Sequence, residues 1–168
     1  LELDLVELQR KGRVRVDHDV PADSPLWAEA GVRPRGALAV RLEARRVGSD
    51  VLVRGRITVE VEQECRRCLE TAVTRIDDAV SLLFRAGLDP AEAERQEVYA
   101  LPPRARELDL GAPVREHVLL AVPAFAVCRE DCRGLCPRCG ANLNQGPCGC
   151  RAGSIDPRWA ALRPADRD

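Results

Sequence analysis

The chain has 168 residues, of which 45% are apolar and 3% aromatic, and its 26 basic and 27 acidic side chains leave a formal net charge of −1. This length and apolar content suit one globular domain, or one domain with a small metal-held appendage. The even charge balance excludes a strongly basic nucleic-acid-binding domain, and the few aromatic rings exclude extensive base stacking. The longest apolar run, 118–127, is interrupted by Pro123 and is too short to cross a bilayer, so we expect no membrane span.

The sequence pattern of the N-terminal segment predicts two short secondary-structure elements. Residues 1–11 have apolar side chains at positions 1, 5 and 8 and are followed by Gly12, which favours a short helix or a strand that runs into one. Residues 13–20 alternate between valine or histidine and charged residues, which predicts a half-exposed strand. We interpret His18 in this strand as a surface residue, because no second histidine lies near it to complete a metal site. The first residue is leucine, so we expect the natural chain to begin further upstream.

A long β-hairpin is the clearest secondary-structure signal in the chain. Residues 36–47 and 51–63 both alternate apolar and charged side chains, and a Gly-Ser-Asp turn at 48–50 separates them. The alternation resumes at 71–76 and again at 79–84, after a Cys-Arg-Arg-Cys sequence. We therefore expect an antiparallel sheet in which the first cysteine pair lies in a turn between strands.

The next stretch predicts a loop and then a helix. Residues 87–97 carry four acids and lack apolar periodicity, which predicts an exposed, disordered loop. Asp109 can cap a helix with Pro113 in its first turn, and Pro123 ends this helix, which we place near 109–122. We interpret His117 on the helix as a surface or packing residue, because no cysteine is close to it in sequence.

The eight cysteines divide into two sets of four. The first pair has the spacing C-x2-C, and the other six lie within 23 residues. Thiolates with such spacings bind a single metal ion from a tight turn. One set is local and consists of Cys136, Cys139, Cys148 and Cys150. The other joins distant parts of the chain and consists of Cys65, Cys68, Cys128 and Cys132. An exchange of Cys128 and Cys132 with Cys148 and Cys150 is the alternative partition, and either partition predicts two structural zinc ions.

Three other uses of the cysteines are less consistent with the sequence. Four disulfides suit small secreted proteins that lack a core, whereas this chain is long enough to build one. A catalytic zinc site keeps an open coordination position and usually includes histidine or glutamate, whereas eight paired cysteines fill two closed sites. A thioredoxin-like C-x2-C opens a helix, whereas this one lies between predicted strands. We therefore expect a protein that is not an enzyme.

Arginines flank the cysteines. Arg66, Arg67, Arg133, Arg138 and Arg151 lie in or beside the cysteine motifs. Positive side chains next to thiolates reduce the repulsion among them, so a purely electrostatic role is one interpretation. Contact with nucleic-acid phosphates is the other, because an arginine fork matches phosphate oxygens.

Several motifs resemble the YceD-like family, also called large ribosomal RNA subunit accumulation proteins. They are the CRRCL at 65–69, the RGLCPRCGANLN at 133–144 and the DPRWAAL at 156–162, which follow one another in the family's order. The resemblance implies a cytoplasmic protein, as in bacteria or plastids, with a role in the accumulation or processing of large-subunit (23S) ribosomal RNA.

Together these features predict an α+β, mainly β fold: an antiparallel sheet with one or two helices and a C-terminal cysteine-rich zinc knuckle. We expect a β-rich domain at 1–127, a zinc-binding cluster at 128–151 packed on the 65–68 turn, and a C-terminal tail at 152–168. Arg66, Arg67, Arg133 and Arg138 would form one positive rim that contacts ribosomal RNA or a large-subunit precursor. Ribosomal or assembly proteins are further candidate partners, and a protein–protein adaptor without RNA contact is the alternative function.

Overall fold

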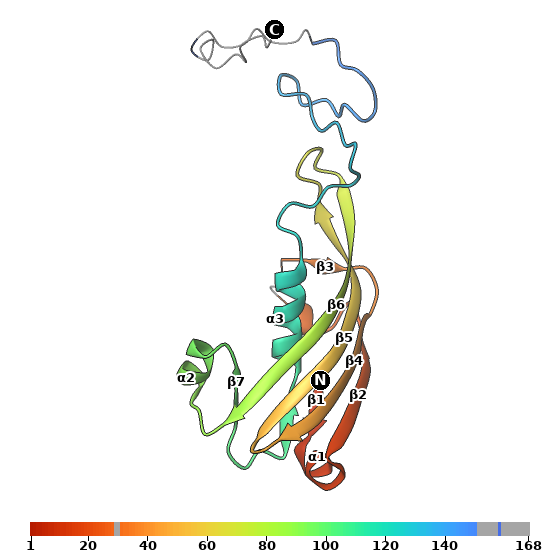
Figure 1. Ribbon diagram of the computed structural model, residues 1–168. Coiled ribbons are helices and arrows are strands. Elements are labelled where there is room, and N and C mark those ends of the chain that lie inside the picture. The colour runs from red at the N-terminus through yellow and green to blue at the C-terminus, as the bar shows by residue number, and fades with distance from the viewer. Residues whose placement is uncertain (29–30, 151–157, 159–168) are drawn as a thin grey trace, which may run out of the picture.

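The computed structural model describes residues 1–28, 31–150 and 158. The molecule is elongated, with a twisted sheet at one end and the cysteine-bearing segment at the other (Figure 1). The fold is mainly β, as predicted, and the described residues include three α-helices rather than one or two. None of these helices combines the length and apolar character that a bilayer crossing requires.

A six-stranded sheet forms the body of the molecule. Its strand order is β2-β4-β5-β6-β7, and β3 also pairs with β5. The strands are β2 (Arg13–Val20), β3 (Arg33–Pro34), β4 (Leu38–Val47), β5 (Asp50–Glu64), β6 (Thr71–Ala86) and β7 (Tyr99–Leu101).

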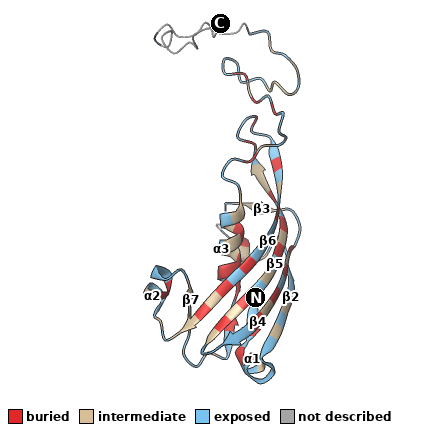
Figure 2. Cartoon of the chain, in the orientation of Figure 1, coloured by how far each residue is buried: buried red, intermediate tan, exposed pale blue. Residues whose placement is uncertain are grey.

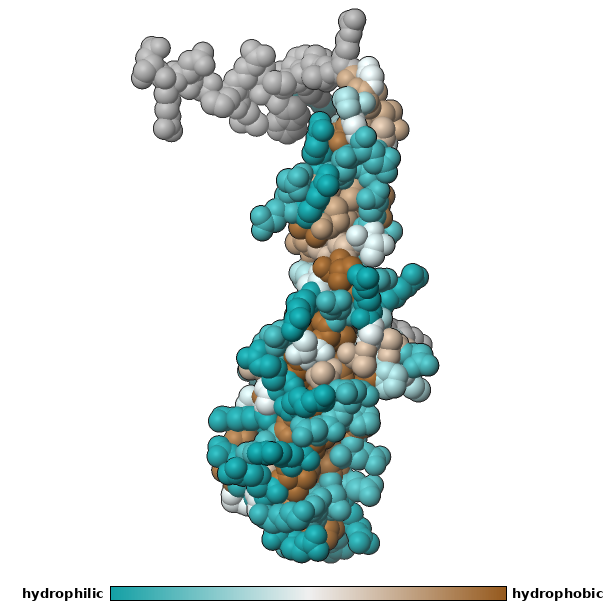
Figure 3. Space-filling view, turned by 90° about the vertical axis from the view of Figure 1, so that its right-hand side faces the viewer, coloured by the Kyte–Doolittle hydropathy of each residue, from teal (hydrophilic) through white to brown (hydrophobic). Residues whose placement is uncertain are grey.

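The predicted hairpin is β4 and β5, which pair from Ala39 opposite Thr58 to Val47 opposite Asp50. Alternate side chains of β5 are buried and the others face outward, as a period of two requires. The two predicted segments at 71–76 and 79–84 are one continuous strand, β6, which pairs with β5 along almost its whole length. Figure 3 shows that one side of the molecule is mostly hydrophilic over the sheet, with apolar surface between the charged groups.

The six-stranded sheet is antiparallel, as predicted, except at one edge. β7 pairs with β6 in parallel, with Tyr99 opposite Phe84, so the sheet is mixed. Parallel neighbours require a crossover connection. Residues 87–98 form that connection and include the helix α2 (Pro90–Arg95).

The loop predicted at 87–97 therefore contains a helix. Asp89 accepts a hydrogen bond from the Glu92 N–H, and the Glu92 side chain accepts one from the Asp89 N–H. This capping box stabilises a helix of only six residues that has almost no apolar periodicity.

The N-terminal segment is a strand that runs into a helix, which is the second of the two predicted alternatives. β1 (Glu2–Asp4) pairs with β8 (Glu107–Asp109) in a separate two-stranded sheet. α1 (Leu5–Lys11) follows directly, with the Asp4 carboxylate capping its first N–H groups and Gly12 ending it in the left-handed conformation. A 3-10 turn, η1 (Pro25–Trp27), lies between β2 and β3.

The predicted C-terminal helix is α3 (Gly111–Ala121), which covers one face of the sheet (Figure 1). The N-cap residue is Leu110, which forms no side-chain capping hydrogen bond, and not Asp109 as expected. Asp109 lies one residue earlier, and its carboxylate accepts a hydrogen bond of 2.8 Å from the Gly111 N–H. Val114 and Val118 are fully buried and share one apolar cluster with the inward side chains of β4 and β5. Figure 2 shows this buried layer between helix and sheet.

A second, smaller apolar cluster lies beyond the main core. It contains Cys65, Cys68, Ala72, Ala126 and Cys132. Cysteine side chains thus form most of the packing at this end of the molecule, which places the candidate site where β5 ends and β6 begins.

Candidate metal centres

The first cysteine pair lies in the tight turn between β5 and β6. The Cys65 N–H donates to the Glu70 carbonyl oxygen (2.8 Å), and the Leu69 N–H donates to the Cys65 carbonyl oxygen (2.9 Å). Leu69 has a positive φ of 63°, which closes the turn at some conformational cost. Both thiols of the pair are buried and point into the small cluster.

The segment after α3 brings the second pair to this turn. The Arg66 N–H donates to the Ala126 carbonyl oxygen (2.9 Å), two residues before Cys128. The Sγ atoms of Cys65 and Cys132 are then 3.8 Å apart, and those of Cys68 and Cys128 are 3.6 Å apart. The first set thus joins parts of the chain that are 60 or more residues apart.

These distances fit a metal ion and not a disulfide. A disulfide requires a separation of about 2.0 Å between sulfurs. A tetrahedral metal at about 2.3 Å from each sulfur places the sulfurs about 3.8 Å apart. All four Sγ atoms of the first set lie within 4.8 Å of one another.

The second set is built within one short loop and consists of Cys136, Cys139, Cys148 and Cys150, whose Sγ atoms also lie within 4.8 Å of one another. The Cys136 N–H donates to the Ala141 carbonyl oxygen (2.8 Å), and the Gly140 N–H donates to the Cys136 carbonyl oxygen (2.9 Å). Gly140 has a φ of 73°, which an L side chain adopts poorly. Cys136 is buried, whereas Cys139 and Cys150 are exposed.

The thiols of the first set differ widely in pKa. Burial raises the pKa of the Cys65 thiol, but the backbone N–H groups of Cys128, Arg67 and Cys68 stabilise the thiolate and lower that pKa to about 6. Burial and the neighbouring thiols raise the pKa of Cys128 to about 12. One thiol therefore ionises readily while another is held protonated beside it, and a bound dication would remove this conflict.

The second set has the same pattern. The backbone N–H groups of Cys139 and Arg138 lower the pKa of Cys136 to about 6. The hydrogen bond with Cys139, followed by burial, raises the pKa of Cys150 to about 12. Both sets are therefore closed groups of four thiols, positioned to bind one metal ion each.

Arg67 connects the two sets. Its guanidinium Nη1 donates to the carbonyl oxygens of Glu130 and Cys132, each at 3.0 Å. Its own carbonyl oxygen accepts a hydrogen bond of 3.0 Å from the Leu135 N–H, one residue before the second set begins. This arginine thus holds the turn of the first set against the segment that leads into the second.

Two asparagines make further connections between the sets. Asn144 lies in the loop of the second set, and its Nδ2 donates to the Cys132 Sγ of the first set at 3.4 Å. This contact lowers the pKa of Cys132. Asn142 Nδ2 donates to the Glu70 carboxylate (2.8 Å), in the turn of the first set. These are the two asparagines of the chain, and their place beside the cysteines indicated a role in the local turn. Their contacts with Cys132 and Glu70 of the first set and its turn were not predictable from the sequence.

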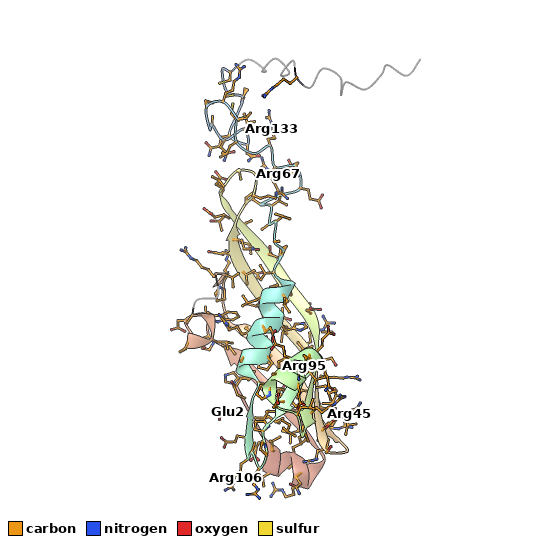
Figure 4. All side chains as sticks on the ribbon, turned by 90° about the vertical axis from the view of Figure 1, so that its left-hand side faces the viewer. Glu2, Arg45, Arg67, Arg95, Arg106 and Arg133 are labelled. Carbon is orange, nitrogen blue, oxygen red and sulfur yellow. The ribbon has the colours of Figure 1, made fainter. Side chains whose placement is uncertain are left out.

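The other predicted site residues lie at the same end of the molecule. Arg66, Arg133 and Arg138 are exposed, and the Arg66 guanidinium lies 4.3 Å from the centroid of the Phe125 ring. Figure 4 shows Arg67 and Arg133 at the cysteine-bearing end, opposite Arg106. Arg151 and the predicted tail at 152–168, with its DPRWAAL motif, lie outside the described residues except for Arg158.

Neither histidine belongs to a metal group among the described residues. His18 is exposed on β2. His117 on α3 lies beside Asp78 of β6, with Nε2 and Oδ2 3.0 Å apart. The surface and packing roles expected for them agree with these positions.

The fold and the site define a mainly β protein that carries, at one end, two four-cysteine groups positioned to bind metal ions. Residues 53–164 match the family model described as large ribosomal RNA subunit accumulation protein YceD. The chain belongs to this family, and membership implies a role in the accumulation of large-subunit ribosomal RNA.

Several curated proteins are similar to the chain. It is 36% identical to an uncharacterized protein of Mycobacterium tuberculosis over 166 residues, which cover 96% of this chain and 79% of that protein. It is 32% identical over 96 residues to a chloroplastic protein of Arabidopsis thaliana named large ribosomal RNA subunit accumulation protein YCED homolog 1, and these residues cover 51% of this chain and 30% of that protein. No solved structure matches the chain significantly.

Proposed function

We propose that the protein is a non-catalytic, zinc-stabilised factor that binds large-subunit (23S) ribosomal RNA or its precursor during ribosome assembly. The observation that carries this proposal is the end of the molecule where two four-cysteine sets and four arginines occur together. The setting we propose is the bacterial cytoplasm, where ribosomes assemble.

Zinc is the metal that this ligand set favours. Four thiolates in tetrahedral positions suit zinc or an iron–sulfur site, and the Sγ distances leave room for only one ion in each set. Zinc has no redox chemistry, and a site closed by four protein ligands offers no position for substrate or water. Both features support a structural role and not catalysis.

The arginines supply the surface that would contact RNA, but their guanidinium groups differ in how far they are already bound within the protein. Arg133 and Arg138 have no ion pair with any described residue, so their guanidinium groups are available to phosphates. Arg66 lies over Phe125, and Arg67 is bound to two carbonyl oxygens. We therefore expect Arg133 and Arg138 to contribute more to RNA binding, and Arg67 to contribute more to structure.

RNA binding by variants at these positions tests the proposal. The double variant Arg133→Ala/Arg138→Ala should bind large-subunit RNA fragments more weakly, with a salt slope reduced by about one unit for each lost phosphate contact. Arg15→Ala/Arg45→Ala, at exposed positions on β2 and β4 that also have no ion pair with the described residues, is the matched control and should bind as the parent does. Equal binding by parent and double variant, with zinc retained, would contradict the RNA role and favour a protein–protein adaptor.

Metal content tests the zinc part separately. Elemental analysis of protein purified without chelator should give about two zinc ions per chain, because each set binds one ion. Iron in place of zinc, or four disulfides by mass spectrometry, would contradict this part of the proposal.

A further inference from the structure

A cleft of ≈ 800 Å³ lies between β7, α2 and α3, on the side of the sheet body that faces the viewer in Figure 4. Its lining consists of ten apolar or aromatic residues and four acidic residues, with no basic residue. Basic and acidic residues are almost equally numerous in the whole chain, so the lining of the cleft is more acidic than the chain as a whole. A concave, mostly apolar site of this size is typical of a binding site.

The apolar part of this acidic cleft is preformed. Phe84 and Leu108 are buried beneath it. The Tyr99 ring lies 5.2 Å from that of Phe84, and its hydroxyl donates to the Glu116 carboxylate at 2.9 Å. Leu120 is 80% exposed at the edge of the cleft, so apolar surface extends from the interior out onto α3. An exposed leucine beside an apolar cleft is typical of an interaction surface.

The four acidic residues give the cleft its charge. Glu94 and Glu97, at the end of α2 and just after it, are exposed, and their carboxylates form no ion pair or hydrogen bond with the described residues. Glu116 and Asp109 line the opposite wall. The Glu116 carboxylate accepts from the Tyr99 hydroxyl, and the Asp109 carboxylate accepts from the Gly111 N–H and lies 3.9 Å from the Leu1 ammonium. Among the described residues no arginine pairs with any of the four carboxylates, and Glu94, Glu97 and Glu116 have no cationic partner.

A peptide could also pair with the sheet here. β7 is the last strand of the sheet, and three consecutive residues, Val98, Tyr99 and Ala100, line the cleft. The outer edge of β7 has no strand partner among residues 1–28 and 31–150. An edge strand beside an apolar cleft can receive an extended segment through main-chain hydrogen bonds.

We propose that the acidic cleft binds a short basic peptide segment of a partner protein, anchored by one or two large apolar side chains. The apolar anchors fill the space over Phe84 and Leu108, and lysine or arginine side chains meet the carboxylates of Glu94 and Glu97. RNA is repelled by the same carboxylates, so this site differs from the arginine-bearing end in both position and charge. The inference goes beyond the proposed function and does not depend on it.

Fluorescence polarisation with labelled 12-residue peptides and the full chain provides the test. The probe contains arginine and leucine in equal numbers. One comparison peptide has glutamate in place of arginine, and the other has serine in place of leucine. We expect only the arginine–leucine peptide to bind, with affinity that falls as salt increases. Equal binding of the glutamate peptide would overturn the proposal.

Paired variants locate the binding. Glu94→Lys/Glu97→Lys should lower the affinity for the probe by about tenfold, since two attractive contacts become repulsive. Asp23→Lys/Glu60→Lys makes the same change in net charge at two exposed positions outside the cleft and should leave the affinity unchanged. Equal losses in both double variants would overturn the proposal, because binding would then depend only on overall charge.

Two further outcomes of the binding test would assign the acidic cleft to a different ligand. Much tighter probe binding by a chain that ends at Cys150 would assign the cleft to residues 151–168 of the same chain and overturn the partner proposal. Displacement of the probe by an RNA oligonucleotide would also overturn it. The arginine variants that test RNA binding should bind the probe as the parent does, so failure of either proposal can be recognised separately.

Discussion

Gly134 marks the closest approach between the two cysteine-bearing parts of the chain. Its φ is 72°, and a Cβ atom placed there would lie 2.9 Å from the Arg67 carbonyl oxygen, which is too close for ordinary contact. The same carbonyl oxygen accepts the Leu135 N–H. Glycine is therefore required at this position both for its backbone conformation and for its missing side chain.

Gly140 provides a matched comparison for a prediction about the replacement of Gly134 by alanine. It has almost the same φ, 73°, but nothing lies within 4 Å of a Cβ atom placed there. Gly140→Ala should cost about 1 kcal/mol through the left-handed backbone alone. Gly134→Ala should cost about 1–3 kcal/mol more, because the new Cβ atom forces the Arg67 turn and the second set apart. Denaturant unfolding of the metal-loaded variants measures the difference, and equal losses would show that Gly134 has only a conformational role.

Individual residues of the site were predictable to different degrees. The spacing of the cysteines favoured one of two partitions into sets of four, and the structure brings together the favoured sets. A C-x2-C pair carries its geometry in the local turn, but the choice of its distant partners does not follow from spacing. The role of Arg67 was not predictable, since its hydrogen bonds to Glu130 and Cys132 join residues more than 60 positions apart. Sequence suggested a charge-balancing or RNA-binding arginine, whereas the structure gives it a connecting role as well.

At the scale of elements, the β4–β5 hairpin depends on one close contact. Gly55 of β5 lies opposite Leu42 of β4, and a Cβ atom on Gly55 would lie 2.0 Å from the Arg41 carbonyl oxygen. Backbone atoms on a paired strand cannot move away without breaking the pairing. The hairpin therefore requires glycine at position 55, in the middle of the row of inward-facing apolar residues of β5.

Gly55→Ala should consequently be among the more destabilising single substitutions in the sheet. We expect a loss of about 3 kcal/mol or more, at the upper end of the range for overpacking, because the contact is with backbone and not with a flexible side chain. Thr58→Ala, at an outward-facing position on the same strand, should cost less than about 1 kcal/mol. Thermal unfolding of both variants checks this expectation. A Gly55→Ala protein as stable as the Thr58→Ala protein would contradict it.

Elements were predictable where their pattern was long. β4, β5 and β6 have ten or more residues each, and the sequence located β4 and β5 as single strands and β6 as two segments. α2 and β7 have six and three residues, too few for periodicity to be recognised. The Asp-Pro-Ala-Glu sequence at 89–92 was a usable signal for the capping box, but the parallel pairing of β7 depends on tertiary contacts with β6.

At the scale of the whole molecule, the two metal sites differ in what they hold together. The first set forms much of the small apolar cluster at the end of β5 and β6 and joins segments 60 or more residues apart. The second set is local and contacts the first through Asn142 and Asn144. The main core lies apart from both, between the sheet and α3. Loss of the first site should therefore affect more of the chain than loss of the second.

Cys65→Ser and Cys136→Ser test this asymmetry, since each removes one buried thiol from one set. Structural zinc contributes on the order of 10 kcal/mol to the folding of small modules near neutral pH, so either change should release one ion. In Cys136→Ser, faster hydrogen exchange should be confined mainly to residues 133–150. In Cys65→Ser it should also include the ends of β5 and β6 and the segment 122–132, with a larger decrease in Tm. Protection of β2 and β4, which belong to the main core, should persist in both. Equal decreases in Tm and the same exchange pattern in the two variants would contradict the unequal roles that the geometry assigns to the two sites.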